Sequence, residues 1–234
     1  HIVPQGDTTG IPVRLSDAME LIDRTTDFIV SNQHLQLVDE LATSKRFKNI
    51  KLLNYVDEYD PDVQKQFAAM TYRLSLDTYL VVFRGTDDTL IGWKEDFHMT
   101  YMDHVPAQRR AASYLQNVMK EFPKGRFLVA GHSKGGNLAT YACSYLPNRL
   151  FERVDAIYSY DAPGLNRAII ETEGYQRTSP NIRRFVPQGS IVGMMLEVPE
   201  PATIVKSRAF GGFVQHDAFT WMIEKDKFVT LDQT

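Results

Sequence analysis

Six residues, Gly-His-Ser-Lys-Gly-Gly at positions 131–136, constrain the fold of this chain more than any other part of its sequence. They follow the apolar run 127–130 and precede an alanine-containing stretch, which is the order of a strand, a tight turn and a helix. Such a turn is typical of a nucleophile elbow, which holds Ser133 in a strained backbone conformation at the end of a sheet. Gly131 and Gly135 lack the Cβ atoms that would block it. The alternative is an ordinary glycine-rich turn between a strand and a helix.

Length and composition favour one globular domain. The chain has 234 residues, of which 43% are apolar and 24% charged, so it can bury a substantial core. The net charge is −3 without a basic block, so no nucleic-acid partner is expected. No apolar run approaches the ~20 residues that cross a bilayer, and no transmembrane segment is expected. We expect residues 1–12 to form a loose arm and residues 13–234 a single domain.

The cysteine and motif content bears on compartment and cofactors. Cys143 is the only cysteine, which excludes an internal disulfide, and we expect it to be a small buried residue. A chain without disulfides favours a reducing compartment, and we expect a cytoplasmic protein. The chain begins at His1, with no initiator methionine and no secretory apolar segment, so we expect that its original N-terminus was trimmed. Metal-ligand spacing, a phosphate loop and a dinucleotide fingerprint are missing, so we expect no cofactor.

The order of the predicted elements indicates a mixed sheet. The sequence predicts helices near 16–28 and 35–41, then antiparallel strands at 50–59, 67–76 and 79–84. Helices and strands then alternate: a helix at 106–122, strand 127–130, the elbow helix to about 147, strand 154–160, a helix near 165–170, strands 182–186 and 203–206, and a last helix from about 216. This order predicts a three-layer α/β sandwich with a mostly parallel central sheet and antiparallel N-terminal strands.

A serine nucleophile needs a base, because its hydroxyl reacts poorly at neutral pH. Hydrolases with an elbow place their residues in the chain order nucleophile, acid, histidine. Of the six histidines only His216 lies beyond Ser133, so it is the predicted base. A surface or helix-capping histidine is the alternative.

The acid is chosen by position in the sheet. The carboxylates between the serine and the histidine are Glu152, Asp155, Asp161, Glu171, Glu173, Glu197 and Glu200. Ligand sites of open α/β sheets lie at the carboxyl ends of strands. Asp155 begins its predicted strand whereas Asp161 follows the end of the same strand, so Asp161 is the predicted acid. Glu197 and Glu200, in a predicted loop, remain alternatives, and Asp161 itself has a turn-forming or helix-capping alternative.

The developing oxyanion needs hydrogen-bond donors. The backbone N–H of Lys134, directly after the nucleophile, is one candidate. The N–H and hydroxyl of Thr86, in the turn after strand 79–84, are the second, unless this is an ordinary turn between strand and loop. We expect the side chain of Lys134 to be solvated or in a salt bridge.

Two sets of motifs accompany the elbow. Residues 83–86 read Phe-Arg-Gly-Thr, Trp93 and Asp96 follow, and residues 131–139 read Gly-His-Ser-Lys-Gly-Gly-Asn-Leu-Ala. Together they resemble the class 3 (fungal-type) lipase branch of the α/β-hydrolases. Longer motifs resemble a bacterial family of uncharacterised class 3 lipase-like proteins, over about residues 50–224: they lie at 85–88, 92–97, 131–137, 190–193 and 215–217.

The resemblance implies the α/β-hydrolase fold, with Ser133 as nucleophile, His216 as base and Thr86 in the oxyanion hole. Class 3 lipases usually carry their acid after the strand that corresponds to residues 184–186. Ser190 stands there in this chain. Either Asp161, one strand earlier, has taken over the role, or the site works without a carboxylate at that place.

Substrate is indicated by an apolar segment, residues 191–198, which contains Met194 and Met195. Methionine adapts to irregular apolar partners, so this segment either lines an acyl pocket, forms a lid or belongs to the core. We expect these methionines and His132 to be candidate pocket residues, and the loop 87–105 to cover the site. The expected function is hydrolysis of carboxylic esters, including lipid esters, through an acyl-enzyme. The alternatives are a thioesterase or amidase with the same triad, and a catalytically silent binding protein.

Overall fold

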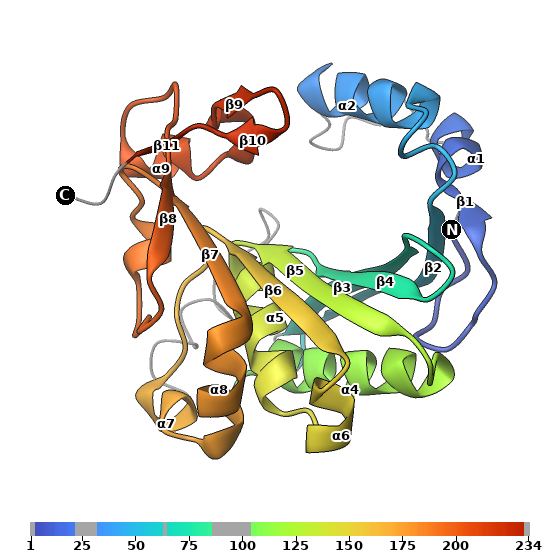
Figure 1. Cartoon of the computed structure of the whole chain (residues 1–234), viewed down its shortest axis with the longest axis horizontal. Coiled ribbons are helices and arrows are strands. Elements are labelled where there is room, and N and C mark those ends of the chain that lie inside the picture. Colours follow the sequence, from blue (N-terminus) through green and yellow to red (C-terminus); the bar gives the residue numbers. More distant parts are fainter. Residues whose placement is uncertain (1–2, 22–31, 63–64, 86–103, 232–234) are drawn as a thin grey trace.

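The structure is a computed structural model that describes residues 3–21, 32–62, 65–85 and 104–231 (Figure 1). Its strands are β1 (Val13–Arg14), β2 (Lys51–Asp60), β3 (Lys65–Arg73), β4 (Thr78–Phe83), β5 (Arg126–His132), β6 (Val154–Tyr160), β7 (Ile182–Pro187), β8 (Ala202–Val205), β9 (Ile223–Glu224), β10 (Lys227–Phe228) and β11 (Thr230–Leu231). Its α-helices are α1 (Leu15–Glu20), α2 (Asn32–Thr43), α4 (Pro106–Glu121), α5 (Lys134–Ser144), α6 (Asn148–Phe151), α7 (Arg167–Ile170), α8 (Glu173–Thr178) and α9 (Gly212–Gln215). Short 3₁₀ helices span Ser179–Asn181, Val192–Met194 and Ala218–Thr220.

Within the described residues, nine strands form one sheet in the order β1-β2-β3-β4-β5-β6-β7-β8-β11. Strands β1 to β4 pair antiparallel, β4 to β8 pair parallel, and β11 returns antiparallel to β8. The parallel pairs bring the carboxyl ends of β4 to β7 to one edge of the sheet, where ligand sites of such sheets form. The mixed α/β fold predicted from the order of the elements is therefore confirmed.

The main core lies on the face of the sheet that α4 and α5 cover, with α6, α7 and α8 on the same side (Figure 1). Successive side chains of a strand point to opposite faces of the sheet, so one set of alternate residues in β3 and β4 faces the core under α4. The rings of Phe67, Phe83 and Tyr114 meet there, with centroids 6.0–6.1 Å apart. On the opposite face, Leu15 of α1 packs with Leu52 of β2. Helices therefore flank the sheet on both sides.

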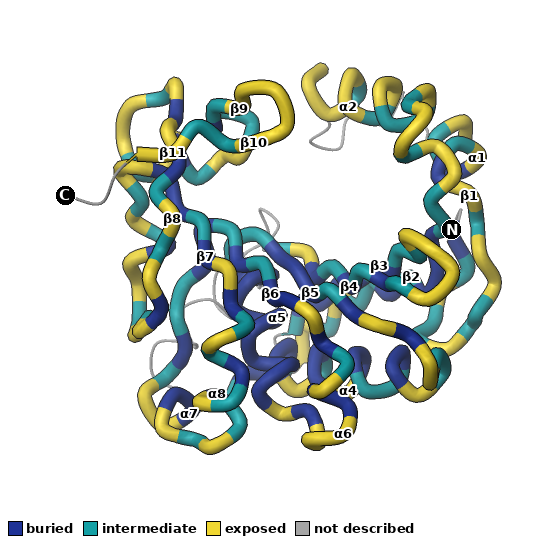
Figure 2. The backbone as a smooth tube through the Cα atoms, viewed as in Figure 1, coloured by how far each residue is buried: buried dark blue, intermediate teal, exposed yellow. Residues whose placement is uncertain are grey.

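Helix α5, which follows the elbow, is the most enclosed helix of the described chain. All of its residues are buried, whereas α2 on the opposite face has none that are buried (Figure 2). Cys143 lies within α5 at 0% exposure, as predicted for a small buried residue, and burial raises the pKa of its thiol. A helix enclosed in this way gives the turn at its N-terminus a rigid base.

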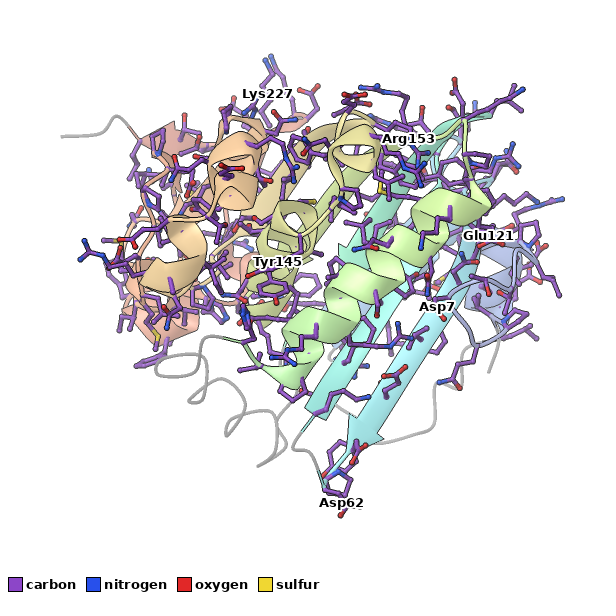
Figure 3. All side chains as sticks on the ribbon, turned by 90° about the horizontal axis from the view of Figure 1, so that it is seen from below. Asp7, Asp62, Glu121, Tyr145, Arg153 and Lys227 are labelled. Atoms are coloured by element: carbon purple, nitrogen blue, oxygen red, sulfur yellow. The ribbon has the colours of Figure 1, made fainter. Side chains whose placement is uncertain are left out.

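The N-terminal arm is anchored along its described part, where the sequence predicted a loose segment. Gly6 N–H donates to Tyr55 O at 2.8 Å, and Asp7 forms an ion pair with Arg110 at 3.1 Å. Asp7 and Glu121 lie on one side of α4, and Glu121 accepts a hydrogen bond from the Asn54 amide at 2.7 Å (Figure 3). The described part of the arm covers an irregularity of β2 whose polar groups need partners, and a loose arm over residues 1–12 stays a prediction.

The C-terminal segment also differs from the prediction of a last helix that begins near His216. Helix α9 ends at Gln215, and a 3₁₀ helix and the β9–β10 hairpin follow. The indole N–H of Trp221 donates to Gln215 O, and Met222 N–H donates to Lys206 O, each at 2.8 Å. Because the Met222 N–H bonds to Lys206 O after β8 and not to the carbonyl four residues before it, the helix does not continue to this point. A short apolar run at helical spacing cannot distinguish these outcomes.

Candidate active site

The turn between β5 and α5 has the geometry of a nucleophile elbow. Ser133 adopts φ 57° and ψ −134°, a conformation that L residues rarely occupy. A Cβ atom at Gly131 would lie 2.1 Å from the carbonyl carbon of Gly135, and one at Gly135 would lie 2.2 Å from Phe83 O. Both obstacles are backbone atoms. The turn therefore requires glycine at these two positions, which is the physical basis of the sequence motif.

Lys134 is the first residue of α5, so its backbone N–H lies at the helix N-terminus, where donors favour negative charge. Its side chain is only 1% exposed, so the expectation of a solvated lysine is wrong. The salt-bridged alternative stays a prediction.

Asp161 lies directly after β6 and is fully buried, at 0% exposure. Its Oδ2 is 2.7 Å from Nδ1 of His216, whose side chain is partly exposed. A carboxylate only accepts hydrogen bonds, so Nδ1 carries the proton and donates it. In the neutral ring Nε2 then holds the lone pair that a general base needs. The structure thus joins the predicted acid and the predicted base.

The second oxygen of Asp161 contacts the loop between β7 and β8. Oδ1 accepts hydrogen bonds from Ser190 Oγ and, at 3.1 Å, from Gly193 N–H. Gly193 fits closely, because a Cβ atom there would lie 2.5 Å from Oδ1. Ser190, which the sequence resemblance places at the expected acid position, therefore contacts the carboxylate that follows the neighbouring strand β6.

His132 supports the segment that carries His216. Its Nε2 lies 2.8 Å from His216 O, and since a carbonyl only accepts, Nε2 is the protonated nitrogen. The centroids of the two imidazole rings are 4.4 Å apart. Burial, and next a positive charge on His216, lower the pKa of His132 and so favour its neutral form. We expected a pocket residue here; this anchoring contact was missed, because only the fold brings the two histidines together.

The alternative acids have other partners. Asp155 pairs with Arg126 at the opposite end of β6. Glu200 is buried and accepts hydrogen bonds from Tyr175 OH at 2.6 Å and Ser179 Oγ at 2.8 Å. Glu197 is exposed. Of the acids weighed from the sequence, only Asp161 bonds to His216 within the described residues.

The second candidate oxyanion donor, Thr86, lies outside the described residues, as do Trp93 and Asp96 in the loop that we expected to cover the site. The last described residue before them is Gly85. A Cβ atom at Gly85 would lie 3.2 Å from the Cβ of Ser133, so the end of β4 closely approaches the predicted nucleophile.

Two segments next to the Asp161–His216 pair, one after β7 and one before and within α9, expose apolar side chains. Met194 and Met195 are 69% and 43% exposed, which excludes the core alternative for them. In the segment between β8 and the end of α9, Phe210 is 92% and Phe213 68% exposed. The two segments touch, because a Cβ atom at Gly212 would lie 2.4 Å from the Ile191 side chain. We call Ile191, Met194, Met195, Phe210, Phe213 and Val214 the apolar rim.

Among the described residues, no group of three or more His, Cys, Asp and Glu side chains is arranged to hold a metal ion. None of the helices in the described ranges has the length and apolar character needed to cross a membrane.

Comparison with known proteins supports the fold. MDLA from Penicillium cyclopium, in a mutant form, superposes with a TM-score of 0.52 at 15% identity, over 79% of this chain and 73% of that chain. The Rhizomucor miehei lipase–propeptide complex gives a TM-score of 0.49 at 18% identity over 68% of this chain, which spans 57% of that chain. No curated protein matches the chain. A family model described as Mbeg1-like matches residues 41–234, and the chain therefore belongs to the Mbeg1-like family.

Proposed function

We propose that this protein is a serine hydrolase that cleaves carboxylic esters through an acyl-enzyme. The observation that carries the proposal is the 2.7 Å hydrogen bond between His216 and the buried Asp161, formed beside an elbow that holds Ser133 at positive φ. The ring of His216 lies 4.4 Å from that of His132, the residue that precedes the serine. This combination supplies a nucleophile, a base and an orienting acid.

In the proposed reaction, Ser133 Oγ attacks the ester carbonyl carbon while His216 Nε2 takes the hydroxyl proton. The C–O bond to the leaving alcohol then breaks, and the imidazolium returns the proton to that alcohol. Water, deprotonated by the same nitrogen, then attacks the acyl carbon. The bond between this carbon and Ser133 Oγ breaks, the imidazolium returns the proton to Oγ, and the carboxylic acid is released. The backbone N–H of Lys134 and the N–H and hydroxyl of Thr86 are the proposed oxyanion donors.

The electrostatics of the site favour this sequence of steps. The proton transfer creates an imidazolium, which the buried carboxylate of Asp161 stabilises because few water molecules screen the pair. His132 stays neutral, since burial lowers its pKa, and so does not repel the developing charge.

The apolar rim supports esters with an apolar acyl chain, including lipid esters, as substrates. Exposed aromatic and methionine side chains next to a site bind apolar groups and adapt to their shape. We expect kcat/KM for p-nitrophenyl esters to rise from acetate to octanoate. A steady decrease along that series would contradict an apolar substrate while leaving the serine chemistry in place.

The test of the chemistry compares the wild type with Ser133→Ala on these esters. Loss of the nucleophile should lower kcat by roughly 10³-fold or more. Ser75→Ala, in the exposed turn between β3 and β4, is the matched control and should retain the wild-type rate. Equal rates for the wild type and Ser133→Ala would overturn the proposal.

Labelling by a fluorophosphonate separates the remaining alternatives. The wild type should be labelled at Ser133, and a protein that binds without catalysis should not react. Oxyester, thioester and anilide substrates with one common acyl chain then rank the esterase, thioesterase and amidase activities. A rate for the thioester or anilide that exceeds the oxyester rate would reassign the leaving group.

A further inference from the structure

We propose that Ser190 is a positioning residue, whose hydroxyl holds the Asp161 carboxylate in the orientation that His216 requires. This inference rests on the proposed function. It concerns a side chain that touches neither the nucleophile nor the base and acts only through the acid.

The contacts of the carboxylate divide between its two oxygens. Oδ2 receives the Nδ1–H of His216 at 2.7 Å, while Oδ1 receives the Ser190 hydroxyl and, at 3.1 Å, the N–H of Gly193. Because a carboxylate is planar, fixing Oδ1 sets the rotation of the group and therefore the direction of Oδ2. The two donors on Oδ1 thus determine where the bond to the histidine can form.

The hydrogen-bond pattern also assigns the direction of the Ser190 hydroxyl. Gly193 N–H donates to Ser190 Oγ at 2.9 Å, so that oxygen already accepts one bond. An ionised Asp161 offers no proton, so the hydroxyl hydrogen is the one shared with Oδ1. Asp161 has no exposed surface, so bulk water does not readily replace this bond.

The loop that carries Ser190 is itself tied to the sheet. Ser190 N–H donates to Pro187 O at 3.0 Å, which closes a tight turn after β7. The side chain of Arg184, within β7, donates to Gly193 O, three residues after Ser190. The hydroxyl is therefore presented from a backbone that is held on both sides of Ser190, as positioning requires.

The experiment measures kcat and KM for Ser190→Ala, Ser190→Val and Ser190→Thr. A hydrogen bond to a charged, buried acceptor predicts that Ala and Val lower kcat roughly 10- to 100-fold, with KM changed by less than about 2-fold. Ser190→Thr keeps the hydroxyl and should keep most of the activity. Because Val has nearly the same shape as Thr but no hydroxyl, a loss in Ser190→Val alone would be due to the hydrogen bond and not to side-chain size. Ser179→Ala, which removes a hydroxyl from the buried Glu200, is the matched control and should retain full activity.

A double-mutant cycle separates positioning from a structural role. In an Asp161→Asn background, Ser190→Ala should lower kcat by less than about 2-fold, because the group through which it acts is already lost. An equal loss in both backgrounds would overturn the proposal, as would wild-type kcat for Ser190→Ala and Ser190→Val. These failures differ from failure of the proposed function, which would be seen as activity that Ser133→Ala does not reduce.

Discussion

The turns after β5 and β6 lie side by side at the carboxyl edge of the sheet, and each carries one residue of the proposed triad. Ser133 has φ 57° and Asp161 has φ 43°, so both depart from the conformations that L residues prefer. Each also bonds to the next strand through its own N–H, Ser133 to Tyr160 O at 2.9 Å and Asp161 to Phe185 O at 2.8 Å. The two turns thus share a positive φ and a backbone hydrogen bond to the next strand.

They differ in what holds that geometry. The chain enters α5 directly after Ser133, so backbone packs on backbone and glycine is needed at 131 and 135. After Asp161 the chain continues as a loop, and the carboxylate is held by donors on His216 and on the β7–β8 loop. The first turn is therefore held by close backbone packing, within itself at Gly131 and against β4 at Gly135, and the second by side-chain hydrogen bonds from other segments.

Removing the negative charge of Asp161 from the second turn should give the largest loss of kcat. Asp161→Asn tolerates the positive φ, but its amide can present N–H to His216 Nδ1 and favour the wrong tautomer. We expect kcat to fall by roughly 10²- to 10⁴-fold, more than for Ser190→Ala. Asp155→Asn, at the opposite end of β6, should leave kcat unchanged. A larger loss for Ser190→Ala than for Asp161→Asn would contradict the assignment of the acid.

Blocking the first turn should chiefly reduce stability. The Cβ atom of Gly135→Ala would lie 2.2 Å from Phe83 O, and neither backbone can move freely. We expect the free energy of unfolding to fall by about 3 kcal/mol, measured by urea denaturation. Gly211→Ala is the control, because its Cβ atom meets open space and only φ +89° opposes it, at about 1 kcal/mol. Equal losses at both positions would contradict a steric origin of the motif.

Moving the acid tests whether strand ends or particular loops decide its place. Asp161→Gly removes the carboxylate and suits the positive φ, and adding Ser190→Asp puts a longer acid where Ser190 Oγ already bonds to Asp161. We expect the second change to restore kcat roughly tenfold over Asp161→Gly alone. No recovery in a folded double variant would mean that only the end of β6 can orient His216.

Relieving the backbone strain of the two turns should give the smallest change, and this change is in stability. Glycine removes the cost of a positive φ, so Ser133→Gly and Asp161→Gly should each be about 1 kcal/mol more stable than the alanine variant at the same position. Each comparison deletes the same side-chain contacts, which isolates the backbone. Alanine variants as stable as the glycine variants would show that neither turn stores strain.

Prediction from the sequence succeeded where a pattern was local. Strand β6 has the predicted bounds, 154–160, because a short apolar run between turn residues defines a buried strand. The prediction of a last helix in the C-terminal segment was wrong. The hydrogen bonds of Trp221 to Gln215 and of Met222 to Lys206 decide the form of this segment. The spacing of apolar residues predicts which side chains are buried. It does not predict which other segment accepts the hydrogen bonds of these residues.

By itself the sequence indicated the elbow at Ser133, because a Gly-x-Ser-x-Gly turn stands between an apolar run and a helical stretch. The demand for glycine at 131 comes from the turn's own backbone at Gly135, whereas the demand at 135 comes from Phe83 O of β4. The sequence also predicted His216 as the base, because this is the only histidine beyond the serine. The tertiary structure decided the partners of Asp161, which lie 29 and 55 positions away at Ser190 and His216. Parallel strands bring such residues to one edge of a sheet, and only the packed loops decide which side chains then come within hydrogen-bonding distance.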